Sequence, residues 1–279
     1  YFYSLTKPTI KMRVTGLHSF FSPQNPAVRQ LLLLLFVSLG LTASVQGQNV
    51  TVNPGGGSYT TLTAAFAAIN AGTHTGAVTV SIIASTNEGT GTAVLNASGT
   101  GSASYTSVTV TPSGGAWTIS GGTTAGNPLI DLSGAYNVTV NGLNSGGNSL
   151  TISNTTASAT SGTATIRFIG GATSNTITNC TVLGSFSASV TTNGGNIYFA
   201  ADAVTDNGND NNTVSNCDLG PAGASVPTKC IYSNGSTTTT ALANSGLNIN
   251  NNTIHDYFGA AVTSAGIYFG GGTDASTIS

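Results

Sequence analysis

Hydrophobic and polar positions alternate in short runs that return at a regular interval through the second half of the chain. The phrase Asn-x-Ile/Val-x-Asn-Cys-x-Val/Leu occurs twice, and a variant without the cysteine occurs once. Its second asparagine recurs at steps of 37 and 35 residues, at Asn179, Asn216 and Asn251. A fixed period of this length predicts stacked structural repeats rather than a globular enzyme domain.

A second apolar phrase recurs in step with the first. Its isoleucines are 31, 34 and 36 residues apart, at Ile166, Ile197, Ile231 and Ile267. Each unit therefore holds at least two short β-strands, separated by Gly, Ser, Asn and Thr. A propeller blade would show hairpin signals for an antiparallel meander, whereas these units repeat a single-face phrase with Asn at the bend. The pattern favours a β-solenoid, in which each unit is one coil.

One helix is predicted near the start of the repetitive region. Leu62, Ala65, Phe66 and Ile69 follow the i, i+3, i+4, i+7 spacing of a single apolar stripe. A β-branched run at residues 77–84 follows it and predicts a strand. Because the end of a stack of strands exposes unpaired backbone groups, we expect the helix to cap that end.

These phrases, and the opening from Tyr59 to Ala84, resemble the coils of right-handed parallel β-helices of the pectate-lyase-like superfamily, of the type secreted by bacteria. The resemblance covers residues 49–279. It implies an all-β fold, a right-handed parallel β-helix (β-solenoid) with one N-terminal capping helix. The motif residues are structural, so the resemblance says much about architecture and little about activity.

Stacking of coils about 4.8 Å apart would place equivalent side chains above one another. An interior ladder is then expected from Ile177, Val214 and Ile249. The three repeated asparagines would stack at a bend, where Asn tolerates left-handed geometry and neighbouring amides can hydrogen-bond along the ladder.

Two cysteines, Cys180 and Cys217, occupy the same place in successive units. They could form a disulfide if the protein meets an oxidising compartment. The favoured alternative is a pair of buried thiols that fill space, because stacked side chains on parallel strands are poorly angled for bridging.

The amino-terminal region carries the pattern of a targeting sequence. An apolar run of 11 residues at 31–41 follows Arg29 and precedes small residues that suit cleavage after Gly47. The run is shorter than the roughly 20 residues that span a bilayer. We therefore expect a signal peptide over residues 12–47 and a secreted or cell-surface protein without a transmembrane segment.

Three segments are expected on this basis. Met12 is the only methionine, so residues 1–11 are expected to precede the natural start, and residues 48–279 are expected to form the β-helix domain. Residues 272–279 repeat the pattern of residues 171–178, which leads into the first Asn-Cys phrase. The domain is therefore expected to be truncated at its C-terminus.

Charge argues against a nucleic-acid partner. Only 5% of residues are charged, and after Gly47 only Arg167 and Lys229 stand against eight carboxylates. Such a chain has no basic stripe for a phosphate backbone. A polysaccharide or cell-surface glycan is the expected partner, and the protein is expected to be monomeric.

Catalytic signatures are weak. Lyases and hydrolases of the resembled superfamily are expected to use a basic residue beside acidic calcium ligands, or clustered aspartates with Gly-His-Gly and Arg-x-Lys signatures, and neither pattern occurs. Asp202, Asp206 and Asp210 fall within nine residues and could bind calcium or act as an acid/base pair, although a turn-forming loop is the favoured interpretation. No catalytic residue and no other cofactor is predicted, and His255-Asp256 is interpreted as a turn pair.

Three tyrosines recur beside the interior isoleucines, at Tyr198, Tyr232 and Tyr268. Alternation along a strand points them outward, where an aromatic stripe would suit sugar rings. The leading hypothesis is a structural or adhesive module that presents a hydroxyl- and amide-rich face to a glycan or another surface. The alternative is a fragment of a polysaccharide lyase or glycoside hydrolase whose catalytic coils lie outside this chain.

Overall fold

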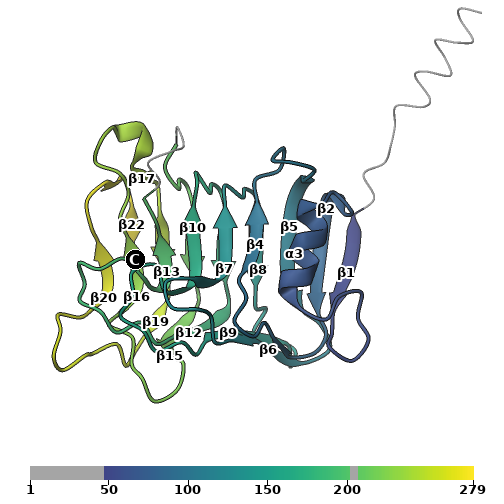
Figure 1. Cartoon of the computed structure of the whole chain (residues 1–279), viewed down its shortest axis with the longest axis horizontal. Helices are drawn as coiled ribbons and strands as arrows, with labels where there is room; N and C mark the ends of the chain where they lie inside the picture. Colours follow the sequence, from purple (N-terminus) through teal and green to yellow (C-terminus); the bar gives the residue numbers. More distant parts are fainter. Residues whose placement is uncertain (1–46, 202–206) are drawn as a thin grey trace, which may run out of the picture. The chain divides into compact units, whose positions relative to one another are not determined.

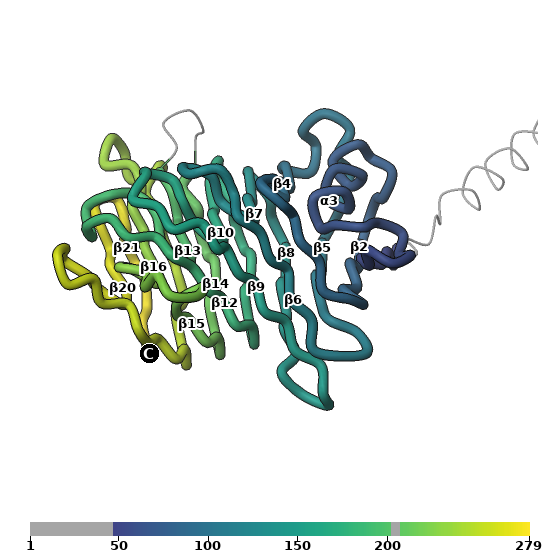
Figure 2. Tube along the Cα trace, turned by 60° about the horizontal axis from the view of Figure 1, so that its bottom comes forward, coloured from purple at the N-terminus to yellow at the C-terminus, as the bar shows by residue number. Residues whose placement is uncertain are grey.

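The computed structural model describes residues 47–201 and 207–279, and these form a parallel β-solenoid of about seven turns (Figure 1). Each complete turn passes through three strands, and each of the three belongs to a different parallel sheet. The tube view follows the same turns in sequence order (Figure 2). The expected signal peptide lies outside the described residues, apart from Gly47, and so do Asp202 and Asp206.

The first sheet, here called the threonine sheet, is eight-stranded and entirely parallel. Its strands, in spatial order, are β1 (Gln48–Val52), β2 (Thr75–Ile82), β5 (Ser104–Pro112), β8 (Val138–Asn141), β11 (Thr176–Thr178), β14 (Thr213–Ser215), β18 (Asn248–Asn250) and β22 (Thr277–Ile278).

A second sheet of six strands is called the tyrosine sheet. It contains β4 (Ala93–Asn96), β7 (Pro128–Ser133), β10 (Ala164–Ile169), β13 (Gly195–Phe199), β16 (Lys229–Ser233) and β20 (Ala265–Phe269).

The third sheet also has six strands. These are β3 (Thr86–Asn87), β6 (Ala116–Gly121), β9 (Ser149–Asn154), β12 (Cys180–Gly184), β15 (Asp218–Pro221) and β19 (Thr253–Ile254). A short pair, β17 (Asn244–Ser245) with β21 (Thr273–Asp274), and the 3₁₀ helix η1 (Thr240–Leu242) complete the described elements.

The core consists of ladders of aliphatic side chains inside the coil. The longest ladder takes one residue from every strand of the threonine sheet, in register: Val50, Val80, Val110, Val140, Ile177, Val214, Ile249 and Ile278. All but the last are at most 3% exposed. Burying each such side chain contributes about 1.5–3 kcal/mol, so stacking of coils is what stabilises any one of them.

The bends between the threonine sheet and the third sheet have left-handed backbone geometry. The φ angles are 55°, 54° and 52° at Asn179, Asn216 and Asn251. This is the conformation that Asn tolerates better than most residues. At one of these bends Asn179 Nδ2 donates to Asn141 Oδ1 of the preceding coil at 2.9 Å. The buried amides that bond from coil to coil lie elsewhere, and they are Asn175 with Asn212, and Asn209 with Asn244.

Helix α3 (Leu62–Asn70) lies at the amino-terminal end of the stack, as the sequence predicts. It buries Leu62, Ala65, Phe66 and Ile69 and packs against β4, so it takes the place of a tyrosine-sheet strand in the first turn. Asn70 covers the edge of β4, because its Nδ2 donates to the Val94 carbonyl at 2.9 Å. The helix therefore satisfies backbone groups that an open sheet edge would leave unpaired.

The buried carboxylate of Glu88 fixes the start of this helix. It accepts hydrogen bonds from the backbone N–H groups of Leu62 and Thr63 at 3.0 and 2.8 Å. These N–H groups have no partner within the helix. The negative charge of Glu88 is also attracted to the partial positive charge that the helix dipole places at this end. No helix among the described residues has the length and apolar character needed to cross a bilayer.

Candidate functional site

The outer side of the threonine sheet carries a continuous row of hydroxyl and amide side chains, one from each strand. This threonine row consists of Asn49, Thr79, Thr109, Thr139, Thr176, Thr213, Asn248 and Thr277, all in register. Strand alternation places the row outside because the residues that follow it form the interior ladder. The five central threonines are all partly exposed.

These five central threonine side chains have no hydrogen-bond partner within the described part of the chain. Their hydroxyls are therefore free to bond to water or to a ligand. The strands of the sheet also contribute no charged side chain. The face is thus polar but electrically neutral over its whole length.

A second row lies two residues further along each strand, on the same face: Thr51, Ser81, Thr111, Asn141, Thr178, Ser215 and Asn250. Several side chains of this row are hydrogen-bonded, unlike the five central threonines. Ser81 Oγ donates to Asn49 Oδ1 of the threonine row at 3.0 Å, and Ser215 Oγ donates to Thr178 Oγ1 within the second row at 3.0 Å. These bonds hold the side chains in fixed orientations. The two rows together are called the threonine face.

The three predicted tyrosines form a column on the outer side of the tyrosine sheet. The Tyr198 and Tyr232 ring centroids are 5.4 Å apart, and those of Tyr232 and Tyr268 are 5.7 Å apart. Two of the rings are covered, however, since Tyr198 is 3% and Tyr232 is 2% exposed. Burial raises the pKa of Tyr198, and of Tyr232 as well. The predicted outward direction is correct, but only Tyr268 is partly exposed, so the column is not the open stripe expected from the sequence.

A loop covers part of this column. This cover loop, residues 185–194, connects β12 to β13 and is held by Lys229. The Lys229 Nζ donates to the Ser189 and Val190 carbonyls, each at 3.2 Å, and also to that of Thr192. The same nitrogen lies 4.2 Å from the centroid of the Tyr232 ring. Three carbonyl dipoles and an aromatic face thus surround an amine that has no exposed surface.

Burial lowers the pKa of Lys229 to about 7. No carboxylate pairs with it among the described residues. The cover loop is also tied to a loop two turns further on, because Val190 N–H donates to the Thr263 carbonyl at 3.1 Å.

An ion pair continues the column toward the amino-terminal end. Arg167 stands in register with Tyr198 on one side and Asp131 on the other. Its Nε and Nη2 donate to the two Asp131 oxygens at 3.0 and 2.7 Å. Burial alone would lower the pKa of Arg167, but the hydrogen bonds and charge of Asp131 outweigh it and raise that pKa. The bidentate geometry occupies both carboxylate oxygens, so this pair holds two coils together.

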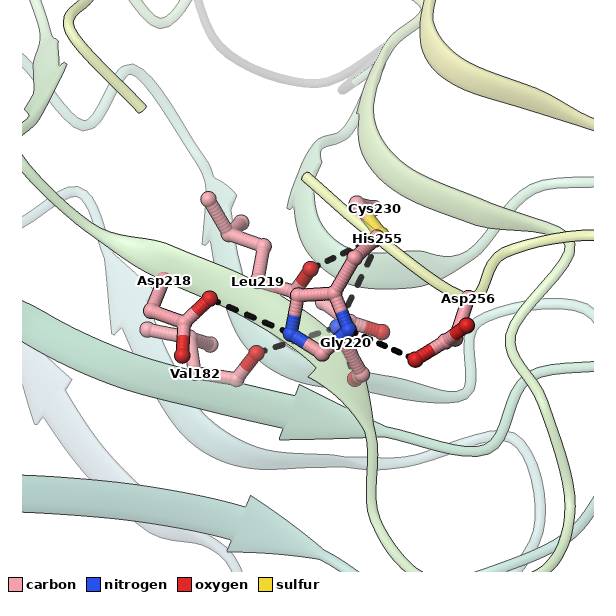
Figure 3. A network of polar contacts seen from close by, with 8 residues as sticks. Val182, Asp218, Leu219, Gly220, Cys230, His255 and Asp256 are labelled. Atoms are coloured by element: carbon pink, nitrogen blue, oxygen red, sulfur yellow. Dashed lines mark hydrogen bonds and ion pairs between the residues drawn. The ribbon is translucent and has the colours of Figure 1, made fainter. Parts of the chain in front are cut away.

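His255 lies between two carboxylates on the surface near β15 (Figure 3). Its Nδ1 is 2.8 Å from Asp256 Oδ2, and its Nε2 is 3.1 Å from Asp218 Oδ1. The hydrogen bond to Asp256 raises the pKa of His255, burial lowers it slightly, and the Asp218 charge raises it further. Gly220 lies beneath the ring, where a Cβ would meet Nε2 at 2.6 Å. Because the carboxylates lie on opposite sides of the imidazole, they do not converge on one metal position.

Of the three aspartates predicted as possible calcium ligands, Asp210 lies among the described residues. Asp210 Oδ1 accepts bonds from the backbone N–H and the hydroxyl of Ser245, at 2.8 and 2.9 Å. Asp202 and Asp206 lie outside the described residues. Within residues 47–201 and 207–279 no group of three or more His, Cys, Asp or Glu side chains could hold a metal ion. Asp210 has a structural role that ties one coil to the next.

Cys180, Cys217 and Cys230 are free thiols, and all three are buried. Cys180 Sγ donates to the Thr178 carbonyl at 3.2 Å, and Cys217 Sγ makes the equivalent bond to Ser215. The hydrogen bond that Cys180 donates to Cys217, and then burial, raise the pKa of Cys180, while the same bond lowers the pKa of Cys217. Burial raises the pKa of Cys230 to about 12. A raised thiol pKa leaves little thiolate, so Cys180 and Cys230 act as apolar fillers.

Comparison with protein-family models, with curated proteins and with solved structures gives no match. The likeness to the pectate-lyase-like superfamily therefore rests on the residue pattern, and the structure establishes a parallel β-solenoid. Sequence reasoning identified the tyrosines but missed the threonine row. Its signal was a threonine followed by Val or Ile, repeated at irregular steps of 30, 30, 37 and 37 residues from Thr79 to Thr213.

Proposed function

We propose that this chain is a structural and adhesive module of a secreted or cell-surface protein, and that its threonine face binds an extended, uncharged partner such as a polysaccharide. The observation that carries the proposal is the row of five in-register threonines whose hydroxyls are not used inside the protein. A neutral, regular face suits a partner that is itself neutral and periodic.

Three charged side chains elsewhere support this assignment because they are engaged within the fold. Arg167 pairs with Asp131, Lys229 holds the cover loop, and Glu88 caps helix α3. These contacts stabilise the coil and its covered faces. The third sheet also carries unused hydroxyls at Thr118, Thr151 and Thr181, but the next residue of that row is Asp218, so the uninterrupted run on the threonine face is longer. A rigid scaffold that carries such a run can act as a binding module.

Binding of the full chain to insoluble polysaccharides and to a glycan array tests the proposal. We expect binding that Thr139→Lys reduces several-fold, because the change places a bulky charge in the middle of the row. Tyr268→Ala, on a different face, should leave binding unchanged. Absence of binding to every polysaccharide and every other solid surface tested, for a chain that is folded by circular dichroism, would count decisively against the proposed function.

A further inference from the structure

We infer that the partner of the threonine face is crystalline ice. This inference rests on the proposed function, because it assigns a specific partner to the same face. It is argued from the spacing of the threonines, from the chemistry of their side chains and from the rigidity of the sheet that carries them.

The spacing of the threonine row is set by the backbone. Neighbouring strands of a sheet lie about 4.7–4.9 Å apart, so in-register side chains repeat at that interval along the solenoid. Thr79, Thr139 and Thr213 stand in the same row, with Thr109 and Thr176 between them, and none of these steps is interrupted. Oxygen atoms in the surface planes of hexagonal ice repeat at nearly the same interval. The threonine hydroxyls can therefore occupy successive lattice positions.

Side-chain chemistry favours ice over a sugar polymer. Each threonine presents a methyl group beside a hydroxyl, so it can bond to one water molecule and pack against the next. Neither row contains an aromatic side chain on which a sugar ring could stack. The face is also uncharged, which matches a lattice of neutral water molecules and avoids the tightly held hydration of ionic groups.

Rigidity allows many weak contacts to act together. Directly after each row threonine comes a β-branched residue of the interior ladder, such as Val80 after Thr79 or Val140 after Thr139, and these are at most 1% exposed. β-branched side chains have few rotamers, so the packed ladder fixes the strand spacing beneath the row. When contacts are held at matching intervals, each further contact forms without a new entropic cost of association.

The decisive experiment grows ice slowly from a solution of the full chain and compares the protein concentration in the ice with that in the remaining liquid. The difference between freezing and melting temperatures and the shape of single crystals are recorded in parallel. We expect the chain to enter the ice, to separate the two temperatures and to produce faceted crystals. An unrelated protein of similar size should be excluded from the ice.

Two matched variants locate the site. Thr139→Lys lies in the middle of the threonine row, whereas Thr151→Lys makes the same change at a partly exposed threonine on the outer side of the third sheet, where Thr118, Thr151 and Thr181 are in register. We expect a several-fold loss of ice incorporation for Thr139→Lys and none for Thr151→Lys. If Thr139→Lys does not fold, Thr139→Ser removes one methyl group and should also weaken incorporation.

The outcomes separate this inference from the proposed function. If the wild-type chain is excluded from ice but binds crystalline chitin or cellulose through Thr139, the ice assignment is wrong and the proposed function stands. If it binds neither ice nor polysaccharide, both are wrong. Equal losses for Thr139→Lys and Thr151→Lys would overturn the assignment of ice to the threonine face.

Discussion

Asn175 and Asn212 lie one coil apart and are joined by two hydrogen bonds to a single oxygen. The backbone N–H and the Nδ2 of Asn175 donate to Asn212 Oδ1 at 2.9 and 3.1 Å. Asn212 Nδ2 in turn donates to the Ala172 carbonyl at 2.8 Å. One buried amide thus satisfies backbone groups that the turn between the tyrosine sheet and the threonine sheet would leave unpaired.

Replacing Asn212 with alanine should therefore be costly. The change leaves the Asn175 N–H and the Ala172 carbonyl without their partner, and each buried orphan costs about 1–3 kcal/mol. We expect Asn212→Ala to lower the free energy of unfolding by several times as much as Asn248→Ala, which alters an exposed asparagine. Denaturant unfolding of the two variants measures this, and similar midpoints would contradict the role of the amide.

The left-handed bend at Asn216 gives a second prediction. Its φ is 54°, which costs an ordinary residue about 1–2 kcal/mol and costs glycine little. Asn216→Gly should leave stability nearly unchanged, whereas Asn216→Val should lower the melting temperature. Thr253→Val, at an exposed strand position in the next coil, is the control and should have little effect. Equal stability of Asn216→Val and Asn216→Gly would show that the bend adopts another conformation.

Lys229 should make the protein more stable as pH rises above neutrality. Burial lowers its pKa to about 7 in the folded protein, from 10.5 ordinarily, so between these values the unfolded chain binds more protons than the folded chain. Stability then rises with pH in that window, by at most about 1.4 kcal/mol per pH unit. We expect urea unfolding between about pH 7 and about pH 9 to show this slope in the wild type and to lose it in Lys229→Met. A slope shared by both proteins would assign it to other groups.

His255 should titrate at higher pH than a free histidine. Because its pKa is raised, its stabilising charge is present below the ordinary value of 6.5 and is lost as pH rises through the folded value. Asp256→Asn should lower the pKa of His255 more than Asp218→Asn does, since the hydrogen bond to Asp256 is the larger cause. NMR titration of the ring protons measures both shifts.

The stacking of the coils could be predicted from the sequence because it depends on periodicity. Ile177, Val214 and Ile249 recur at the spacing of the repeat, and the ladder requires only that equivalent residues lie above one another. The apolar stripe from Leu62 to Ile69 predicted helix α3 for a similar reason. The period of the apolar residues shows which side of a strand or helix is buried. The interior ladder and the buried side of helix α3 both follow from this information.

Burial on the outer side could not be predicted in this way. Tyr198 and Tyr232 alternate with interior residues, so the pattern places them outside, but the loop that covers Tyr232 has no periodic sequence. Such a loop packs on the tyrosine sheet only if particular contacts hold it there. In this protein those contacts are the hydrogen bonds from Lys229 to the loop carbonyls. The sequence shows only that Lys229 is one of the two basic residues after Gly47.

The positions of the buried amide pairs could not be predicted for a different reason. The repeated phrase contains two asparagines, such as Asn175 and Asn179, and the sequence does not tell which of them faces inward. The turn geometry decides this, because Asn175 is fully buried while Asn179 takes the left-handed position and stays partly exposed. The threonine row was missed because its coils differ in length, so its alignment appears only once the strand register is known.

The bond from Val190 to Thr263 has a mechanical consequence. In a linear array each coil contacts only its immediate neighbours, so a pulling force would be expected to peel turns away singly. Here the two bonded loops belong to turns separated by a third, and that middle turn is enclosed between them. Under tension these turns should give way together, as one larger rupture event, while the turns toward the amino terminus yield in smaller steps.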